Sequence, residues 1–134
     1  MKRIIKKIVL FICVHNSARS QMAQAIYNSK SRRSYAKSAG SKPGEKVSTM
    51  ALAALAEIDV HPINPVPKKL TQEMVDEAFR IFTMGCKEEC PTTEKFVADW
   101  GLPEPIPGNM ESYRKLRDLI VQKVKKLLKE VEKK

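Results

Sequence analysis

The sequence contains no long hydrophobic run, no internal repeat and no low-complexity segment. Its most apolar N-terminal stretch, residues 4–12, is interrupted by Lys6 and Lys7. That stretch is too short for a membrane span, which needs about 20 apolar residues. The basic Met1-Lys2-Arg3 is not followed by an apolar core with a small-residue cleavage site, so no signal peptide is predicted. We therefore expect a cytoplasmic protein that does not bind membranes.

Acidic residues are scarce relative to basic ones, with 15 Asp and Glu against 25 Lys and Arg and a net charge of +10. A balance of this kind raises the possibility of nucleic-acid binding. However, the excess lies mainly in residues 1–7 and in a lysine-rich C-terminal segment. No glycine and aromatic RNA-binding signature and no zinc-finger spacing accompany it. We expect no nucleic-acid partner, and a solvated surface that helps to attract anionic substrates.

Cysteine is also rare, and the three residues are Cys13, Cys86 and Cys90. In a cytosolic chain they do not form a structural disulfide framework, and they indicate catalysis, redox chemistry or metal binding. A chain of 134 residues that is 43% hydrophobic can bury a core without disulfides. We predict a single domain over residues 1–134. Nothing in the sequence demands a second subunit, so a monomer is expected.

Segments typical of strands and of helices alternate along the chain. Apolar or alternating residues predict strands at residues 8–12, 34–40, 78–84 and 96–100. Helical spacing predicts helices at residues 18–29, 48–58 and 71–77 and from about residue 111 onward. Crossovers too long for hairpins favour parallel pairing. The predicted fold class is α/β, a three-layer sandwich with a four-stranded parallel sheet flanked by helices.

Three of these helices carry more specific signals. Ser48 and Thr71 are expected to cap the helices that follow them, and Glu73 lies in a predicted first turn. In the last helix one apolar stripe is predicted to face the core; it consists of Tyr113, Leu116, Ile120, Val124, Leu127 and Val131.

A short polar segment with Cys13 and Arg19 connects the first predicted strand to the first predicted helix. A loop that enters a helix leaves several backbone N–H groups unpaired, and the helix dipole adds partial positive charge. The guanidinium of Arg19 can grip two oxygens of a tetrahedral anion. The same field favours a thiolate, which would make Cys13 a nucleophile. Ser20 is expected either to donate a hydrogen bond to the sulfur or to cap the helix.

The alternative for this segment is purely structural. A cysteine that ends a hydrophobic strand is often a small buried residue, and an arginine is often a surface charge. A strand before the loop, a helix after it and small polar residues between them favour the nucleophile.

Cys86 and Cys90 are separated by three residues in a predicted loop after the third strand. A zinc site would need about four ligands, so His15 or Cys13 would have to complete it from elsewhere, and we expect no metal. A pair of buried thiols without a role is the second alternative. In the third, Cys13 attacks an oxyanion, Cys86 attacks the adduct to form a disulfide with Cys13, and Cys90 takes over that disulfide by exchange.

The segment from Cys13 to Ala23 resembles the phosphate-binding loop of the low-molecular-weight protein tyrosine phosphatases. It is closest to the thioredoxin-coupled arsenate reductases of that superfamily, whereas the phosphatases more often carry glycine at the position of His15. Ser38-Ala39-Gly40 also matches the end of the second strand in this family. The resemblance implies a catalytic Cys13 and Arg19, with the substrate bound by Val14, His15, Asn16, Ser17, Ala18, Arg19 and Ser20.

The resemblance also covers the second and third cysteines. Cys86 and Cys90 follow Thr83-Met84-Gly85, where the arsenate reductases have their two shuttle cysteines and typical phosphatases have none. It implies reduction of arsenate to arsenite by the three-cysteine relay. No bound cofactor is implied, and the partner would be an external thiol reductant such as thioredoxin. Ala18 stands where many relatives have a cysteine, which argues against a disulfide within the loop.

The stretch from Asp99 to Pro105 resembles the family pattern D-W-G-L-x-D-P, in which the aspartate before proline is the general acid. Glu104 stands at that position, so the resemblance implies a catalytic Glu104 whose reach differs by one methylene group. The alternative is an exposed loop glutamate without a role.

Two other functions remain open from the sequence. The first is a phosphatase that hydrolyses phosphate monoesters through a phosphocysteine, with the cysteine pair protecting or regulating Cys13. The second is a basic module that binds nucleic acid or another partner. Binding by such a module would survive Cys13→Ser and fall steeply with salt.

Overall fold

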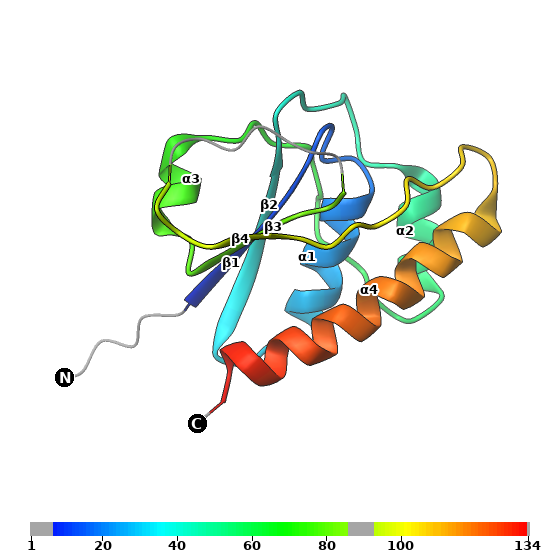
Figure 1. The fold of residues 1–134 in the computed structure, drawn as a ribbon. Helices are drawn as coiled ribbons and strands as arrows, with labels where there is room; N and C mark the ends of the chain where they lie inside the picture. Colours follow the sequence, from blue (N-terminus) through cyan, green and yellow to red (C-terminus); the bar gives the residue numbers. More distant parts are fainter. Residues whose placement is uncertain (1–6, 86–92, 134) are drawn as a thin grey trace.

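In the computed structural model, which describes residues 7–85 and 93–133, four parallel strands form one sheet in the order β2-β1-β3-β4 (Figure 1). The strands are β1 (Lys7–Cys13), β2 (Ser34–Gly40), β3 (Arg80–Thr83) and β4 (Val97–Asp99). The helices are α1 (Arg19–Lys30), α2 (Thr49–Ala56), α3 (Gln72–Glu77) and α4 (Met110–Val131). The predicted α/β fold with a four-stranded parallel sheet is confirmed.

Strand β1 lies at the centre of the sheet and divides the core into two layers. Val9, Phe11 and Cys13 point to the face covered by α1, α2 and α4. Leu10 and Ile12 point to the opposite face, where they pack with residues of the segment around α3. A strand buried on both faces must be apolar at successive positions, which explains its uninterrupted hydrophobic run.

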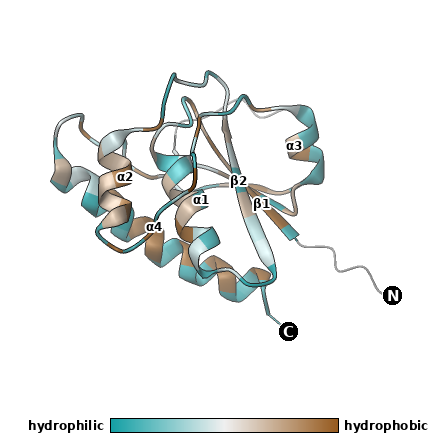
Figure 2. Cartoon of the chain, turned by 180° about the vertical axis from the view of Figure 1, so that it is seen from behind, coloured by the Kyte–Doolittle hydropathy of each residue, from teal (hydrophilic) through white to brown (hydrophobic). Residues whose placement is uncertain are grey.

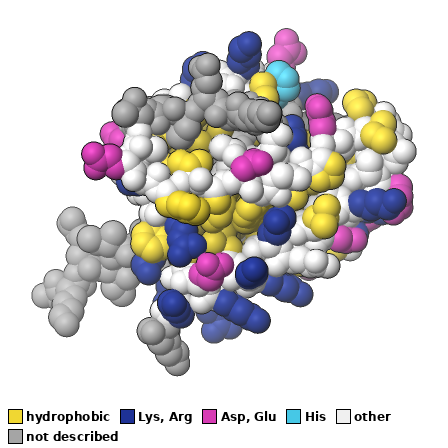
Figure 3. Space-filling view, in the orientation of Figure 1, with side chains coloured by type: hydrophobic (Ala, Val, Ile, Leu, Met, Phe, Trp, Pro, Cys, Tyr) yellow, Lys and Arg dark blue, Asp and Glu magenta, His cyan; other side chains and the backbone are white. Residues whose placement is uncertain are grey.

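The longest helix, α4, behaves as its periodicity predicts. All six residues of its predicted apolar stripe are buried, and brown apolar and teal hydrophilic turns lie side by side along the helix in Figure 2. Lys and Arg side chains are scattered over the face that carries this helix, with acidic side chains between them (Figure 3). No helix among the described residues is both long and apolar enough to cross a membrane.

The element boundaries differ from the predicted ones by one or two residues. The strand predicted at residues 78–84 pairs only at Arg80–Thr83. Ala78 instead closes the last turn of α3, with its N–H donating to the Val75 carbonyl at 3.3 Å. Ser48 and Thr71 cap α2 and α3 as predicted, by accepting from the third residue after them. Asn109, which was not predicted, caps α4 in the same way.

Helices α2 and α4 are joined by one carboxylate. Glu57, at the C-terminal end of α2, accepts hydrogen bonds from Arg114 at 2.9 Å and from Arg117 at 2.7 Å. Arg117 also donates to the Ala54 carbonyl at 3.0 Å. The hydrogen bonds from Arg114 and Arg117 lower the pKa of Glu57 to about 2. This junction holds α2 and the start of α4 together; Ser48, the N-cap of α2, and Tyr113 of α4 line the cavity described below.

We expect Glu57→Gln to lower the melting temperature at neutral pH. The pKa of Glu57 is depressed on folding. Its contribution to the stability of the fold is therefore fully present above the pKa of a glutamate in the unfolded chain, about 4.3. It is lost as the pH falls toward 2, the folded value. Thermal unfolding at several pH values measures this. Glu111→Gln is the control, because Glu111 makes only a 3.6 Å contact with Arg114. Equal melting temperatures of parent and Glu57→Gln at neutral pH would contradict the prediction.

Candidate active site

Cys13 lies at the carboxyl end of β1, between the ends of β2 and β3. The open carboxyl edge of a parallel sheet is where ligands bind in such folds. The Cys13 side chain is only 4% exposed, and its Sγ atom lies 2.8 Å from the Ser20 hydroxyl. The nucleophile proposed from the sequence is therefore buried at the expected edge of the sheet.

The loop from residue 14 to residue 18 is held from outside by the segment between β2 and α2. Three loop carbonyls accept backbone hydrogen bonds: Val14 from Lys42 at 2.9 Å, His15 from Gly44 at 3.0 Å and Ser17 from Ser48 at 2.8 Å. Within a trans peptide the carbonyl and the following N–H point in opposite directions. The N–H groups that follow these carbonyls therefore turn away from the 42–48 segment.

Those N–H groups are available to a ligand. In the part of the chain that the structure describes, no backbone N–H from residue 14 to residue 19 donates a hydrogen bond. Several unpaired N–H groups at the start of a helix form a concave site for an anion. This is the physical basis of the oxyanion site predicted from the sequence.

Gly40 explains why the Ser38-Ala39-Gly40 motif accompanies this loop. A Cβ atom at Gly40 would lie 2.4 Å from the Val14 carbonyl oxygen and 2.9 Å from that of Cys13. Only glycine lets the end of β2 approach the loop this closely. The N–H and carbonyl of Gly40 bond to Lys68 and Leu70, so the loop, β2 and the 68–70 segment form one connected unit.

Ser20 supports the sulfur and does not cap the helix. It lies inside α1, and the capping position is occupied by Ala18, whose side chain makes no cap. The Nδ2 of Asn16 donates to the Ser20 oxygen at 2.6 Å. When Cys13 is a thiolate the sulfur carries no proton, so the Ser20 hydroxyl is the donor in their contact. This hydrogen bond stabilises the negative charge on the sulfur.

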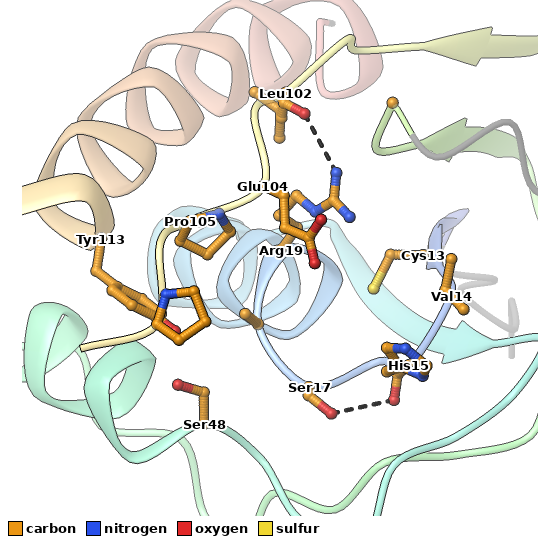
Figure 4. Close-up of a pocket in the computed structure, with 13 residues that line it drawn as sticks. Cys13, Val14, His15, Ser17, Arg19, Ser48, Leu102, Glu104, Pro105 and Tyr113 are labelled. Atoms are coloured by element: carbon orange, nitrogen blue, oxygen red, sulfur yellow. Dashed lines mark hydrogen bonds between the residues drawn. The ribbon is translucent and has the colours of Figure 1, made fainter. Parts of the chain in front are cut away.

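Arg19 joins the loop to the other side of the site. Its Nη1 donates to the Leu102 carbonyl at 3.2 Å (Figure 4). The same nitrogen donates to the Met84 carbonyl at 3.2 Å. Within the described residues its Nε and Nη2 make no hydrogen bond, so two donors of the guanidinium fork are left for an anion. The arginine is therefore held by Met84, the residue after β3, and by the 101–108 loop while it faces the cavity.

A cavity of about 540 Å³ opens over these groups. The residues predicted from the sequence that line it are Cys13, Val14, His15, Ser17, Ala18, Arg19 and Glu104. Asn16 and Ser20 were predicted to bind substrate, but they are buried behind the loop and do not line the cavity. His15 is exposed, and its Nδ1 donates to the Lys42 carbonyl at 2.9 Å, since that carbonyl can only accept.

Glu104 lies in the 101–108 loop, and its carboxyl group extends into the space between Arg19 and Cys13 (Figure 4). Both alternatives for this residue are thus partly met, because the side chain is exposed and it also lines the cavity. A carboxyl group at this place can exchange a proton with a bound ligand.

Asp99 braces the loop that follows β3. Its carboxylate accepts from the Thr83 hydroxyl at 2.8 Å and from the Gly85 N–H at 2.6 Å. Gly85 has a φ of +96° and lines the cavity. Cys86 and Cys90 lie outside the described residues. Gly85, which lines the cavity, is the residue that precedes Cys86 in the sequence.

Several cavity residues were not identified from the sequence. Ser48, Leu102, Pro105 and Tyr113 form walls of the cavity. Tyr113 was predicted only as part of the apolar stripe, although a tyrosine at the first turn of such a stripe can present its hydroxyl to a neighbouring site. The role of the Leu102 carbonyl has no signal in the sequence, since a backbone acceptor is the same at every residue.

The fold and the site together define a class of enzyme. A buried cysteine at the end of a parallel strand, surrounded by free N–H groups and an arginine, is suited to nucleophilic attack on a tetrahedral oxyanion.

Comparison with known proteins assigns the family. Residues 8–134 match the family described as low molecular weight phosphotyrosine protein phosphatase, and the chain belongs to this family. It is 26% identical over 125 residues to arsenate reductase 1 of Bacillus cereus, covering 90% of this chain and 93% of that protein.

Solved structures agree with this assignment. An arsenate reductase from Archaeoglobus fulgidus is 31% identical, with a TM-score of 0.77 over 90% of this chain and 98% of the other. A thioredoxin-dependent arsenate reductase from Corynebacterium glutamicum is also 31% identical, with a TM-score of 0.82 over 95% of this chain. The match spans only 62% of that longer chain.

We expect Gly40→Ala to abolish most phosphate binding, because its Cβ would displace the loop carbonyl that lies 2.4 Å away. Loss of even one charge-assisted hydrogen bond to the anion would weaken binding by about tenfold or more. Calorimetric titration with phosphate measures this. Gly108→Ala is the control: it strains a positive φ of +80° but meets nothing within 4 Å. Equal phosphate affinity of parent and Gly40→Ala would refute the predicted close approach.

Proposed function

We propose that the chain is an arsenate reductase that converts arsenate to arsenite with Cys13 as the nucleophile. The observation that carries this proposal is the buried Cys13 sulfur, 2.8 Å from Ser20, at the base of a loop with free N–H groups. Arsenate and phosphate share their shape and charge, so this cradle accepts either anion. The relatives named as arsenate reductases support the choice of arsenate.

The first step uses the groups described above. The Cys13 thiolate attacks arsenic, a bond from sulfur to arsenic forms, and one arsenate oxygen leaves as water after it is protonated. Arg19 and the loop N–H groups hold the remaining oxygens. Glu104 is the proposed proton donor, because it is the carboxyl group that lines the same cavity as Cys13 within the described residues.

The later steps are assigned to the cysteine pair. The Cys86 thiolate attacks the Cys13 sulfur, and the electron pair of the bond from sulfur to arsenic stays on arsenic, which leaves as arsenite. The resulting disulfide between Cys13 and Cys86 is attacked by Cys90, which frees the Cys13 thiolate. A thioredoxin-like dithiol then reduces the disulfide between Cys86 and Cys90. The assignment of this step to Cys86 is supported by Gly85, which precedes it in the sequence and lies in the cavity wall.

The relay predicts a specific pattern of arsenite production with thioredoxin, thioredoxin reductase and NADPH. The parent should produce arsenite over many turnovers, whereas arsenite production by Cys86→Ser and by Cys90→Ser should stop. Cys13→Ser is the control that removes the first step. Continued turnover of both shuttle variants at the parent rate would refute the relay, and an inactive parent would refute the reductase.

A second candidate function is hydrolysis of phosphate monoesters, and the place of Glu104 in the cavity favours it. In this reaction Cys13 would form a phosphocysteine while Glu104 protonates the leaving alkoxide, and water would then cleave the intermediate. The cysteine pair would only protect or regulate Cys13.

The two functions make different demands on Glu104. With phenyl phosphate, a substrate with a poor leaving group, we expect Glu104→Gln to lower kcat by about 100-fold, the usual contribution of a general acid. Arsenite formation should fall much less, since a small oxyanion can take its proton from water. Glu111→Gln is the control from a neighbouring exposed position. A phenyl phosphatase activity equal in parent and Glu104→Gln would exclude Glu104 as the general acid.

A further inference from the structure

Gln21 is a buried polar side chain of α1 that the proposed chemistry does not use. It is only 5% exposed. Its Nε2 donates to the Asn16 Oδ1 and to the Val66 carbonyl, each at 2.9 Å. These two bonds employ both hydrogens of the amide. Gln21 therefore ties the anion loop to the 63–68 segment through both N–H groups of its side-chain amide.

Asn16 needs this support because its backbone is in the left-handed region, with a φ of +51°. Its Oδ1 accepts a second hydrogen bond, from the Lys68 N–H at 2.9 Å. The two donors determine which way the amide faces, since a flipped amide would set its own N–H groups against both of them. The Nδ2 of Asn16 is consequently directed at Ser20.

The orientation of Asn16 determines what Ser20 can do. The Ser20 oxygen accepts from Asn16 at 2.6 Å, and its hydroxyl hydrogen is then free for the Cys13 sulfur at 2.8 Å. When each group in a chain of hydrogen bonds donates to the next, the bonds polarise one another. The bond from Asn16 to Ser20 therefore strengthens the bond from the Ser20 hydroxyl to the Cys13 sulfur. From these contacts we infer that Gln21 is a positioning residue for the nucleophile: it orients Asn16, which directs the Ser20 hydroxyl toward the Cys13 thiolate.

This inference deepens the proposed function and rests on it for its biological meaning, but its test requires no arsenate. All variants carry Cys86→Ser and Cys90→Ser, so that Cys13 is the sole thiol in the 134 residues. The rate of alkylation by iodoacetamide at pH 7 then reports the reactivity of Cys13, and thermal unfolding reports stability separately.

Gln21→Met retains the length of the side chain and removes both donors. We expect it to slow the alkylation of Cys13 by about fivefold, the effect of losing one ordinary hydrogen bond. Gln24→Met is the matched control. Gln24 lies one turn further along α1; its side chain accepts from the Ser38 hydroxyl and makes no hydrogen bond to the side chain of Asn16 or Ser20. It should lower stability without slowing alkylation. Gln21→Ala replaces Gln21→Met if the latter does not fold.

Alkylation of Gln21→Met at the parent rate would overturn the inference, even if the melting temperature falls. An equal slowing in Gln24→Met would overturn it too, because the effect would then belong to the helix as a whole. Arsenite production by the same variants with all cysteines restored separates the two proposals. An inactive parent together with slow alkylation in Gln21→Met would refute the reductase and leave the role of Gln21 standing.

Discussion

The site depends on one backbone interaction, the capture of the loop carbonyls by the segment between β2 and α2. Lys42, Gly44 and Ser48 bind the carbonyls of the loop and so turn its N–H groups inward. An unpaired N–H group that is shielded from water costs free energy, because it has no hydrogen-bond acceptor. An anionic ligand removes this cost by accepting the hydrogen bonds. The strongest affinity of the site is therefore for a compact anion, and both the arginine and the nucleophile act on what this cradle holds.

The rest of the fold keeps that loop in place from three directions. Gly40 allows β2 to approach it, α1 begins at its end, and Arg19 fastens it to the residue after β3 and to the 101–108 loop. The junction of Glu57 with Arg114 and Arg117 holds together α2 and α4. The N-cap of α2, Ser48, and Tyr113 of α4 line the cavity. A rigid frame of this kind suits catalysis, since the donors need no reorganisation when charge develops.

Buried polar side chains behind the loop are hydrogen-bonded, in contrast to the N–H groups in front of it. Asn16, Ser20 and Gln21 satisfy one another and the backbone of the 66–68 segment. Among the described residues no buried side-chain nitrogen or oxygen lacks a partner. The unpaired N–H groups of the loop therefore face the cavity, while the hydrogen bonds behind them hold the loop in place.

The sequence by itself determined the elements and the chemistry. The apolar run of β1, the stripe of α4 and the caps Ser48 and Thr71 act over a few residues, so their periodicity and side-chain chemistry suffice to predict them. Cys13 and Arg19 were predictable for the same reason. Only the tertiary structure decided that Ser20 faces the sulfur, that Asn16 and Ser20 lie behind the cradle, and that Gln21 supports them. The roles of Asn16 and Gln21 depend on Val66 and Lys68, which lie far along the chain and take part through backbone groups that no residue type reveals.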